Sequence, residues 1–310
     1  LKGKAQISSG WTAGYNVEFA VSDSNSALVT DSKDGDDDGD KKVMELRQNY
    51  WYIESDKYGR VSVGQQSDAA DGAVEVVLGN SQRNSYVAMG DAIHIGASIG
   101  GVTGTTSATL KDFADNLDGT RRDLIRYDSP SVYGFVLSAS WGENDYSDVA
   151  LRFKKEFSNI RVAAGIGYVW MLDNTDTDIE EIAGSASVMH VPTGIYVAFA
   201  AATREYQDST AKDSTMWYVQ AGIEKKFNSL GSTTVYGEYG NYEDMAGAQA
   251  KGYVSPEATR WGVGLNQKID AAAMDIYAQA TFWSFDAENL RTGAELEDLS
   301  TVMVGSRIQF

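Results

Sequence analysis

Apolar and polar residues alternate along most of this 310-residue chain. In the final segment, STVMVGSRIQF, Val302, Val304 and Ile308 fall on one side, whereas Arg307 and Gln309 fall on the other. A period of two is typical of a β-strand whose two faces meet different surroundings. Taken alone, the segment fits equally well a half-buried edge strand of a soluble sheet.

The same alternation recurs from one end of the chain to the other and predicts an all-β protein. Between 214 and 227, for example, Trp217 and Ile223 share one face and Glu224 lies opposite. Only three prolines occur, which suits a chain made mostly of hydrogen-bonded strands. About fifteen strands are predicted, at residues 1–8, 15–22, 44–55, 60–66, 123–129, 135–142, 148–157, 161–170, 182–191, 195–204, 214–227, 233–241, 260–269, 275–285 and 300–310.

The connections between these strands alternate in length. Short turns such as DKYG, FSNI and VPTG are interspersed with long polar loops. This rule is typical of a transmembrane antiparallel β-barrel, which has short turns on one side of the membrane and long loops on the other. No run of 18 apolar residues occurs, so a transmembrane helix is excluded. The long loops are predicted at 23–43, 67–122, 173–181, 243–255 and 286–299.

Strand direction predicts the size of the barrel. The last strand follows a long loop, and counting back through the alternating connections gives segment 1–8 the same direction. Because a closed antiparallel barrel needs an even number of strands, we expect one further strand before Leu1. Sixteen strands would make one transmembrane domain over 1–310 with a water-filled lumen. The N-terminal stretch LKGKAQISSG has no apolar core, so any signal peptide is expected to be already removed.

Composition narrows the function further. The net charge of −18 argues against nucleic acid as a partner, because that needs clustered Lys and Arg. The absence of cysteine excludes a disulfide framework and a thiolate metal site.

Four stretches carry a family resemblance: LKGKAQISSGWTAGYNVEF, LRQNYWYIESDKYGRVSVGQQSD, RRDLIRYDSPSVYGFVLSASWGEN and the terminal SRIQF. They resemble the general porins of Gram-negative bacteria, in particular those of α-proteobacteria. The resemblance implies a homotrimer in the bacterial outer membrane, surrounded by lipid and lipopolysaccharide. It also implies a passive, water-filled channel for small hydrophilic solutes.

The resemblance assigns roles to two parts of the chain. The segment 67–122 corresponds to the family's long third loop, which folds inward and constricts the pore, and its first part, 69–78, could form a short helix. The terminal Phe310 resembles the signal that the outer-membrane assembly machinery reads. Where the family carries a further wall arginine, this chain has Gln65 and Gln66. A second such arginine would lie before Leu1.

A constriction with opposed charges is predicted from these positions. Basic wall residues and acidic loop residues would set up a transverse field that orders polar solutes. The alternative is that the charges are merely solvated in a wide lumen. Because the loop acids outnumber its bases, we expect a weak preference for cations. The predicted set is Lys2, Lys4, Arg47, Arg122 and Arg126 with Gln65 and Gln66 on the wall, and Asp68, Asp71, Glu75, Asp91, Asp112, Asp115 and Asp118 on the loop.

The segment DGDDDGDKKVME is a candidate Ca²⁺ site. Asp34, Asp36, Asp38, Asp40 and Glu45 match the spacing of an oxygen-ligand calcium loop. The flanking segments read as strands rather than helices, and an acidic run of this kind is commonly a solvated loop. A passive channel requires no cofactor.

Three other functions remain open. A barrel enzyme would need a nucleophile near His94 or His190, and neither shows one by spacing, so we expect no catalysis. A substrate-specific channel for a sugar or an anion would carry a row of aromatic residues, for which Tyr218, Tyr236 and Tyr277 are scattered candidates. A soluble β-sandwich that binds a ligand is the third.

Overall fold

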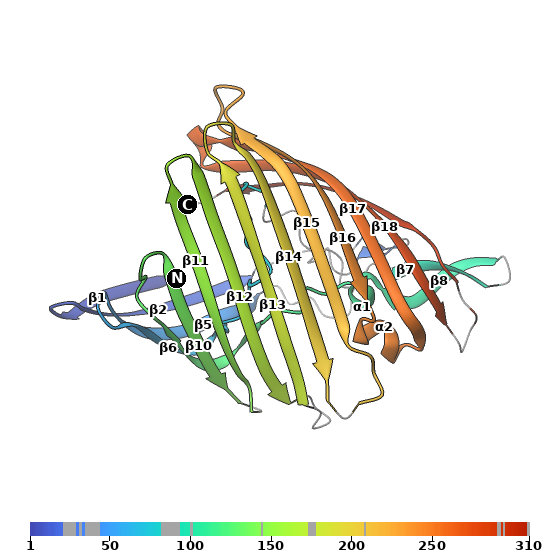
Figure 1. The fold of residues 1–310 in the computed structure, drawn as a ribbon, viewed down its shortest axis with the longest axis horizontal. Coiled ribbons are helices and arrows are strands. Elements are labelled where there is room, and N and C mark those ends of the chain that lie inside the picture. Colours follow the sequence, from blue (N-terminus) through green and yellow to red (C-terminus); the bar gives the residue numbers. More distant parts are fainter. Residues whose placement is uncertain are drawn as a thin grey trace.

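One large antiparallel sheet dominates the structure, a computed structural model (Figure 1). It describes residues 1–20, 29–30, 33–34, 44–81, 94–99, 102–143, 145–172, 178–207, 209–289, 293 and 295–308. Within these residues, 18 strands form the main sheet, and β3 (Val29–Thr30) pairs with β4 (Lys33–Asp34) in a separate ribbon.

Fifteen of the described strands follow one another as the wall, and all fifteen predicted strands are confirmed. Their bounds differ from the predicted ones most in β2, which begins earlier, at Trp11, and in β13, β17 and β18, which extend into the predicted long loops 173–181, 243–255 and 286–299. The wall strands are β1 (Lys2–Ser8), β2 (Trp11–Ala20), β5 (Glu45–Ser55), β6 (Gly59–Ser67), β9 (Arg121–Asp128), β10 (Phe135–Gly142), β11 (Ser147–Phe157), β12 (Ile160–Leu172), β13 (Asp178–His190), β14 (Ile195–Tyr206), β15 (Ser214–Lys225), β16 (Thr233–Glu243), β17 (Tyr253–Ile269), β18 (Met274–Asn289) and β20 (Leu299–Ile308).

The two edges of the wall run in the same direction. Every neighbouring pair from β1–β2 to β18–β20 is antiparallel, and among the described residues β1 pairs only with β2 and β20 only with β18. Fourteen successive reversals leave β1 and β20 parallel. Closure by antiparallel pairs alone therefore needs one more strand, in agreement with the expected sixteen.

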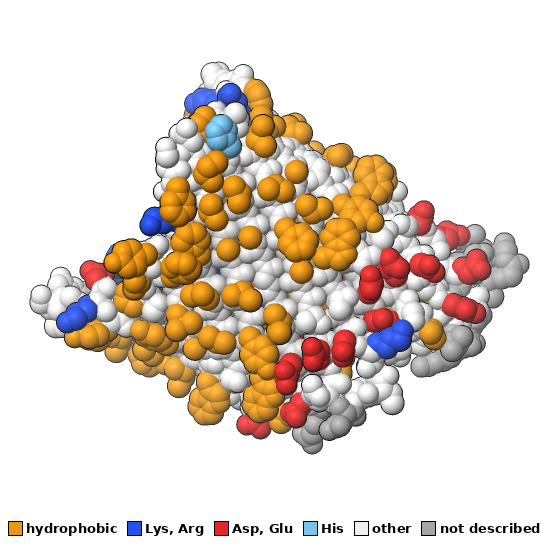
Figure 2. Space-filling model, viewed as in Figure 1, with side chains coloured by type: hydrophobic (Ala, Val, Ile, Leu, Met, Phe, Trp, Pro, Cys, Tyr) orange, Lys and Arg blue, Asp and Glu red, His pale blue; other side chains and the backbone are white. Residues whose placement is uncertain are grey.

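The outer face of the wall is apolar. Val149, Ile166, Phe199 and Val263 are each more than two-fifths exposed there. Figure 2 shows hydrophobic side chains spread over this face, with Lys and Arg mainly at the upper and left margins and Asp and Glu mainly along the right and lower ones. A lipid-facing surface has two requirements: its backbone hydrogen bonds must be satisfied within the sheet, and the side chains that face outward must be apolar. The outer face of this wall meets both.

The segment 67–122 is more structured than expected. Its first part, 69–78, forms turns and irregular chain instead of the predicted helix, because side chains of the wall bind its backbone N–H groups. Its second part contains β7 (His94–Ile99), β8 (Val102–Thr109) and α1 (Leu110–Phe113). The β7–β8 hairpin joins the sheet through β19 (Glu295–Leu296), and it extends beyond the wall in Figure 1.

An apolar core lies between this segment and the inner face of β13–β18. Leu110, Phe113 and Leu117 from the loop pack with residues that include Tyr242 and Trp283 of the wall. Two short helices complete the connections: α2 (Ala246–Ala250), between β16 and β17, and a 3-10 helix at Asp270–Ala272. Burial of large side chains on the concave face indicates that the loop is fixed against one side of the barrel.

Candidate functional site: a charged recess beside the inward loop

The first limb of the loop, residues 68–81, lies along the inner face of the wall. The backbone N–H of Val76 donates to the hydroxyl of Ser185 on β13 at 3.0 Å, and that of Leu78 donates to Ser187 at 3.2 Å. These alternate N–H groups are bound by side chains, since the limb crosses the strands and cannot join their ladder. Small wall residues let the limb lie flat.

Gly167 on β12 tests this docking. A β-carbon there would lie 2.8 Å from the Cβ of Ala70, which is closer than packed carbons approach. We expect Gly167→Val to lower the free energy of unfolding by about 1–3 kcal/mol and to alter single-channel conductance, because the limb must shift. The matched control is Gly237→Val on β16, where a Cβ meets nothing nearer than 3.9 Å. Equal conductance in both variants would contradict the docking.

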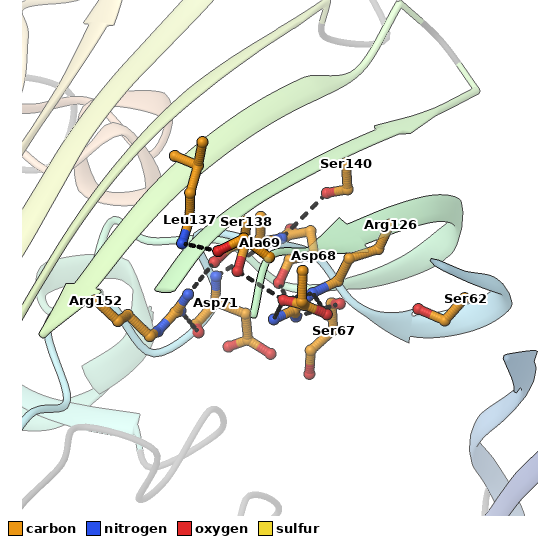
Figure 3. A network of polar contacts seen from close by, with 12 residues as sticks. Ser62, Ser67, Asp68, Ala69, Asp71, Arg126, Leu137, Ser138, Ser140 and Arg152 are labelled. Atoms are coloured by element: carbon orange, nitrogen blue, oxygen red, sulfur yellow. Dashed lines mark hydrogen bonds and ion pairs between the residues drawn. The ribbon is translucent and has the colours of Figure 1, made fainter. Parts of the chain in front are cut away.

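Two wall arginines hold the start of the loop by its carbonyl groups (Figure 3). The Nη1 group of Arg126 on β9 donates to the two carbonyl oxygens of 67–68, at 3.1 and 2.8 Å. Arg152 on β11 donates to the carbonyls of Ala69 and Asp71, at 2.7 and 2.8 Å. Because a guanidinium group offers several donors in a fixed plane, each side chain fixes two peptide units at once.

Two arginines predicted to present free charge to the pore are paired instead. Arg126 binds Asp128 with its Nη2 atom at 2.7 Å, and Asp128 also accepts from Ser138 at 2.6 Å. Arg47 on β5 donates from Nε to Glu18 on β2 at 2.9 Å, with both side chains about two-fifths exposed. Both residues lie on the wall as predicted, but local carboxylates offset their charge.

Asp68 joins the two ends of the loop. Its carboxylate accepts the N–H groups of Asp71 at 2.8 Å and Thr120 at 2.7 Å, and the hydroxyl of Tyr146 at 2.6 Å. Burial raises the pKa of Asp68 above its ordinary value, and these hydrogen bonds oppose the shift. Burial and the neighbouring Asp68 also raise the pKa of Tyr146, which therefore stays a hydrogen-bond donor.

Asp118 makes a second connection between the start and the end of the loop. Its Oδ2 atom accepts the N–H groups of Gly72 at 3.1 Å and Val74 at 3.4 Å. Burial raises the pKa of Asp118 well above its ordinary value, and the charges of Glu75 and Asp71 add to the effect. The pKa of Glu75 is raised for the same two reasons, burial and the charge of Asp71.

A recess of about 390 Å³ lies between the first limb of the loop, the part of the loop that follows α1, and the wall. The loop supplies most of its acidic side chains, and β9 and β14 supply its arginines. A cavity with both signs of charge can hold and orient hydrated polar solutes. Its charged lining consists of Asp71, Glu75, Asp115, Asp118 and Glu181 against Lys111, Arg121, Arg122 and Arg204.

Arg122 is a recess cation whose guanidinium group lies against an aromatic ring instead of a carboxylate. Its guanidinium carbon lies 4.2 Å from the centroid of the Tyr146 ring, and its Nη2 atom contacts the sulfur of Met171 at 3.3 Å. Arg204, in contrast, binds Glu181 at 2.6 Å and Asp115 at 3.4 Å. Among the described residues Arg122 forms no ion pair, so its charge is available to a solute.

The remaining predicted constriction residues are dispersed. Lys2 and Lys4 are exposed on the edge strand β1. Gln66 is buried on the inner face and accepts a hydrogen bond from Ser62 at 2.6 Å. Gln65 falls, by alternation along β6, on the opposite face from these two residues.

Several other predicted residues lie away from the recess or outside the described chain. Asp112 is in α1, where it pairs with Lys251. Of the proposed calcium ligands, Glu45 begins β5 and is exposed, and the backbone of Asp34 ends β4. The others, Asp36, Asp38 and Asp40, lie outside the described residues, as do Asp91 and Phe310.

Sequence reasoning missed the residues that fix the loop from the wall. Arg152, Glu181 and Arg204 stand at inward positions of β11, β13 and β14, and Tyr146 immediately precedes β11. Alternation along these strands marks the first three as polar residues on the inner face. That signal was available, but the identity of their loop partners was not.

None of the helices in the described residues is long and apolar enough to cross a membrane. In the same part of the chain, no group of three or more His, Cys, Asp or Glu side chains is arranged to hold a metal ion.

The fold and the loop together define a channel-type β-barrel, and comparisons assign it to a family. A model described as "Gram-negative porin" matches residues 1–288, so the chain belongs to the Gram-negative porin family. It therefore resides in the bacterial outer membrane. No curated protein sequence matches the chain.

Solved structures support the same fold. OmpT of Vibrio cholerae, folded in vitro, is 14% identical, with a TM-score of 0.59, over 99% of this chain and 87% of that one. OmpF of Salmonella typhi is 14% identical, with a TM-score of 0.59, over 98% of this chain and 87% of that one. A mutant of the Rh. blastica porin is 15% identical, with a TM-score of 0.50, over 100% of this chain and 88% of that one.

Proposed function

We propose that this porin is a passive general-diffusion channel for ions and small hydrophilic solutes. The observation that carries the proposal is the charged recess of about 390 Å³ between the inward loop and the wall. Its lining of carboxylates and guanidinium groups favours hydrated solutes over apolar ones. Passive diffusion through such a lining needs no catalytic group. We therefore propose a channel rather than an enzyme.

We further propose a weak preference for cations. The recess has five acidic side chains against four basic ones, and Arg204 is already paired with two of the acids. At physiological salt, charges beyond about 8 Å are largely screened, so this local balance weighs more than the chain's total charge of −18.

The structure gives less support to a substrate-specific channel. Two of the three tyrosines that would make an aromatic row, Tyr218 and Tyr236, are only 2% and 3% exposed. Tyr218 packs in the core beneath the loop and Tyr236 packs with the loop residues Val77 and Leu78. The structure gives no support to an enzymatic role at His190 either, since the ring of this exposed residue is hydrogen-bonded to Thr193 of its own turn.

We propose a homotrimer set in lipid and lipopolysaccharide as the assembly. One structural neighbour, OmpT of Vibrio cholerae, is described in a trimer form. The apolar outer face of the wall supports a lipid environment (Figure 2). Mass measurement in mild detergent tests the trimer, and a monomeric mass would contradict it.

Conductance in a planar lipid bilayer tests the channel directly. We expect stepwise current increases that scale with salt concentration, and a reversal potential of the cation-preferring sign across a salt gradient. A correctly folded protein that produces no steps would overturn the proposal, and a clear preference for chloride would overturn its selectivity.

Arg122 is expected to control that selectivity. Replacing Arg122 with Gln removes a recess cation that forms no ion pair among the described residues, so the cation-to-anion permeability ratio should rise several-fold. Arg122→Lys should stay near the parent because it retains the charge. The control is Arg161→Gln, since Arg161 pairs with Glu156 at an exposed turn. An unchanged reversal potential in Arg122→Gln would remove this residue from the ion path.

A further inference from the structure

The returning limb of the inward loop, which contains α1, contacts a second loop of the barrel, the connection 244–252. Helix α1 of the inward loop packs against α2, which lies in the connection between β16 and β17 (Figure 1). That connection, 244–252, contributes no residue to the recess. The contact therefore joins the constriction to a segment outside it.

An ion pair closes this contact. The Nζ atom of Lys251 lies 2.5 Å from Oδ2 of Asp112, and these side chains are 32% and 16% exposed. The same carboxylate oxygen accepts the N–H and the hydroxyl of Thr109, each at 2.7 Å. One acid thus caps the start of α1 and binds α2, so loss of the lysine weakens both the contact and the geometry of the cap.

Close packing surrounds the pair. A β-carbon on Gly247 would lie 2.9 Å from the Cα of Asp112, so only glycine lets the helices approach this closely. Phe113 meets the ring of Tyr253 edge-on at 5.1 Å and that of Phe285 at 5.4 Å. Met245 and Ala248 of the second loop are 3% and 0% exposed.

The second loop is itself fixed to the barrel. Gln249 exchanges two hydrogen bonds with the backbone of Lys212, at 2.8 and 2.9 Å, and donates to the carbonyl of Asp244. Asn289 at the end of β18 donates to the carbonyl of Lys251 at 3.2 Å. α2 is therefore a rigid support rather than a mobile cover.

We propose that the α1–α2 contact, formed by Asp112, Phe113, Gly247 and Lys251, is a positioning device for the pore. It holds the returning limb of the inward loop, and with it Asp115 and Asp118, at a fixed place in the recess. Asp115 and Asp118 follow α1 directly in the chain, so displacement of the helix carries them with it. Residues that never touch the solute thereby set conductance and selectivity.

Two variants break the contact in independent ways, and two others serve as controls. Lys251→Met removes the charge but keeps the chain length, and Gly247→Val separates the helices. Lys251→Arg retains the charge. Lys226→Met alters an exposed lysine that pairs with Asp270, and neither of these residues belongs to the inward loop or to the connection 244–252. Heat-resistant migration on gels selects correctly folded protein in each case.

Single-channel recording and trypsin cleavage after Lys111 in α1 measure the result. In Lys251→Met and Gly247→Val, we expect occupancy of a second conductance level and the cleavage rate each to rise about tenfold. Lys251→Arg and Lys226→Met should match the parent. Because the inference rests on the proposed channel function, cleavage provides a test that conductance does not.

The outcomes separate the two proposals. A parent protein that fails to conduct overturns the channel function, and the cleavage rates still decide whether the contact holds the loop. A conducting parent whose two disrupting variants keep one conductance level, the parental reversal potential and the parental cleavage rate overturns the positioning role. Changes confined to the two disrupting variants support it.

Discussion

Arg260→Met should lower the free energy of unfolding by about 3–5 kcal/mol, the effect expected when a buried ion pair loses one partner. Arg260 on β17 binds Glu238 on β16, and the two side chains are 2% and 0% exposed. Glu238 also accepts the hydroxyl of Tyr218 at 2.6 Å and the amide of Gln279 at 2.7 Å. Methionine would leave the carboxylate without its counter-charge in the core beneath the loop. Urea unfolding in lipid vesicles, followed by tryptophan fluorescence, measures the change.

A second substitution separates charge from packing. In the double variant Arg260→Met/Glu238→Gln, the side chain at 238 carries no charge, and its single amide oxygen can still accept from either Tyr218 or Gln279, which bind different oxygens of the carboxylate. We expect it to recover a large part of the lost stability. The exposed pair of Lys226 and Asp270, with both side chains about three-fifths exposed, is the control, and Lys226→Met should cost less than about 1 kcal/mol. Similar losses from Lys226→Met and Arg260→Met would contradict the role assigned to burial.

Acidification should abolish the cation preference before ordinary carboxylates titrate. The pKa values of Glu75 and Asp118 are raised by burial and by the neighbouring charge of Asp71, with Asp115 also raising that of Asp118. As the pH falls, these two recess acids bind protons first, which makes the net charge of the recess more positive. The reversal potential at a fixed salt gradient should therefore start to shift well above pH ~4, where an exposed carboxyl group titrates. A preference unchanged down to that pH would contradict the assignment.

The same groups give stability a defined pH dependence. Because their pKa values are higher in the folded than in the unfolded protein, the folded state binds more protons between the two values. Their contribution to stability is therefore greatest at low pH and falls as the pH rises through the folded pKa values. Asp118→Asn keeps an acceptor for Gly72 and Val74 but cannot ionise, so it should flatten both the stability and the selectivity profiles.

The wall was accessible to sequence reasoning because its signal is local. Side chains of a strand alternate by geometry, so a face toward lipid and a face toward the lumen leave a period of two that needs no knowledge of partners. The parallel direction of the first and last strands followed from the alternating lengths of the connections. The length of 67–122 indicated that it is the functional loop. The alternation of side chains along the strand that follows placed Arg122 and Arg126 on the inner face.

Only the tertiary structure decided what each inward side chain binds. Asp112 and Lys251 are 139 residues apart, and Val76 and Ser185 are 109 apart, so no periodicity links them. The pairing of Arg126 with Asp128 and the stacking of Arg122 on Tyr146 gave two similar arginines different roles. The segment 69–78, which could have formed a helix, forms turns and irregular chain because the wall binds its backbone N–H groups. The strand pattern is visible in neighbouring residues of the sequence. The constriction, in contrast, depends on contacts between distant residues, which form only when the sheet folds around the loop.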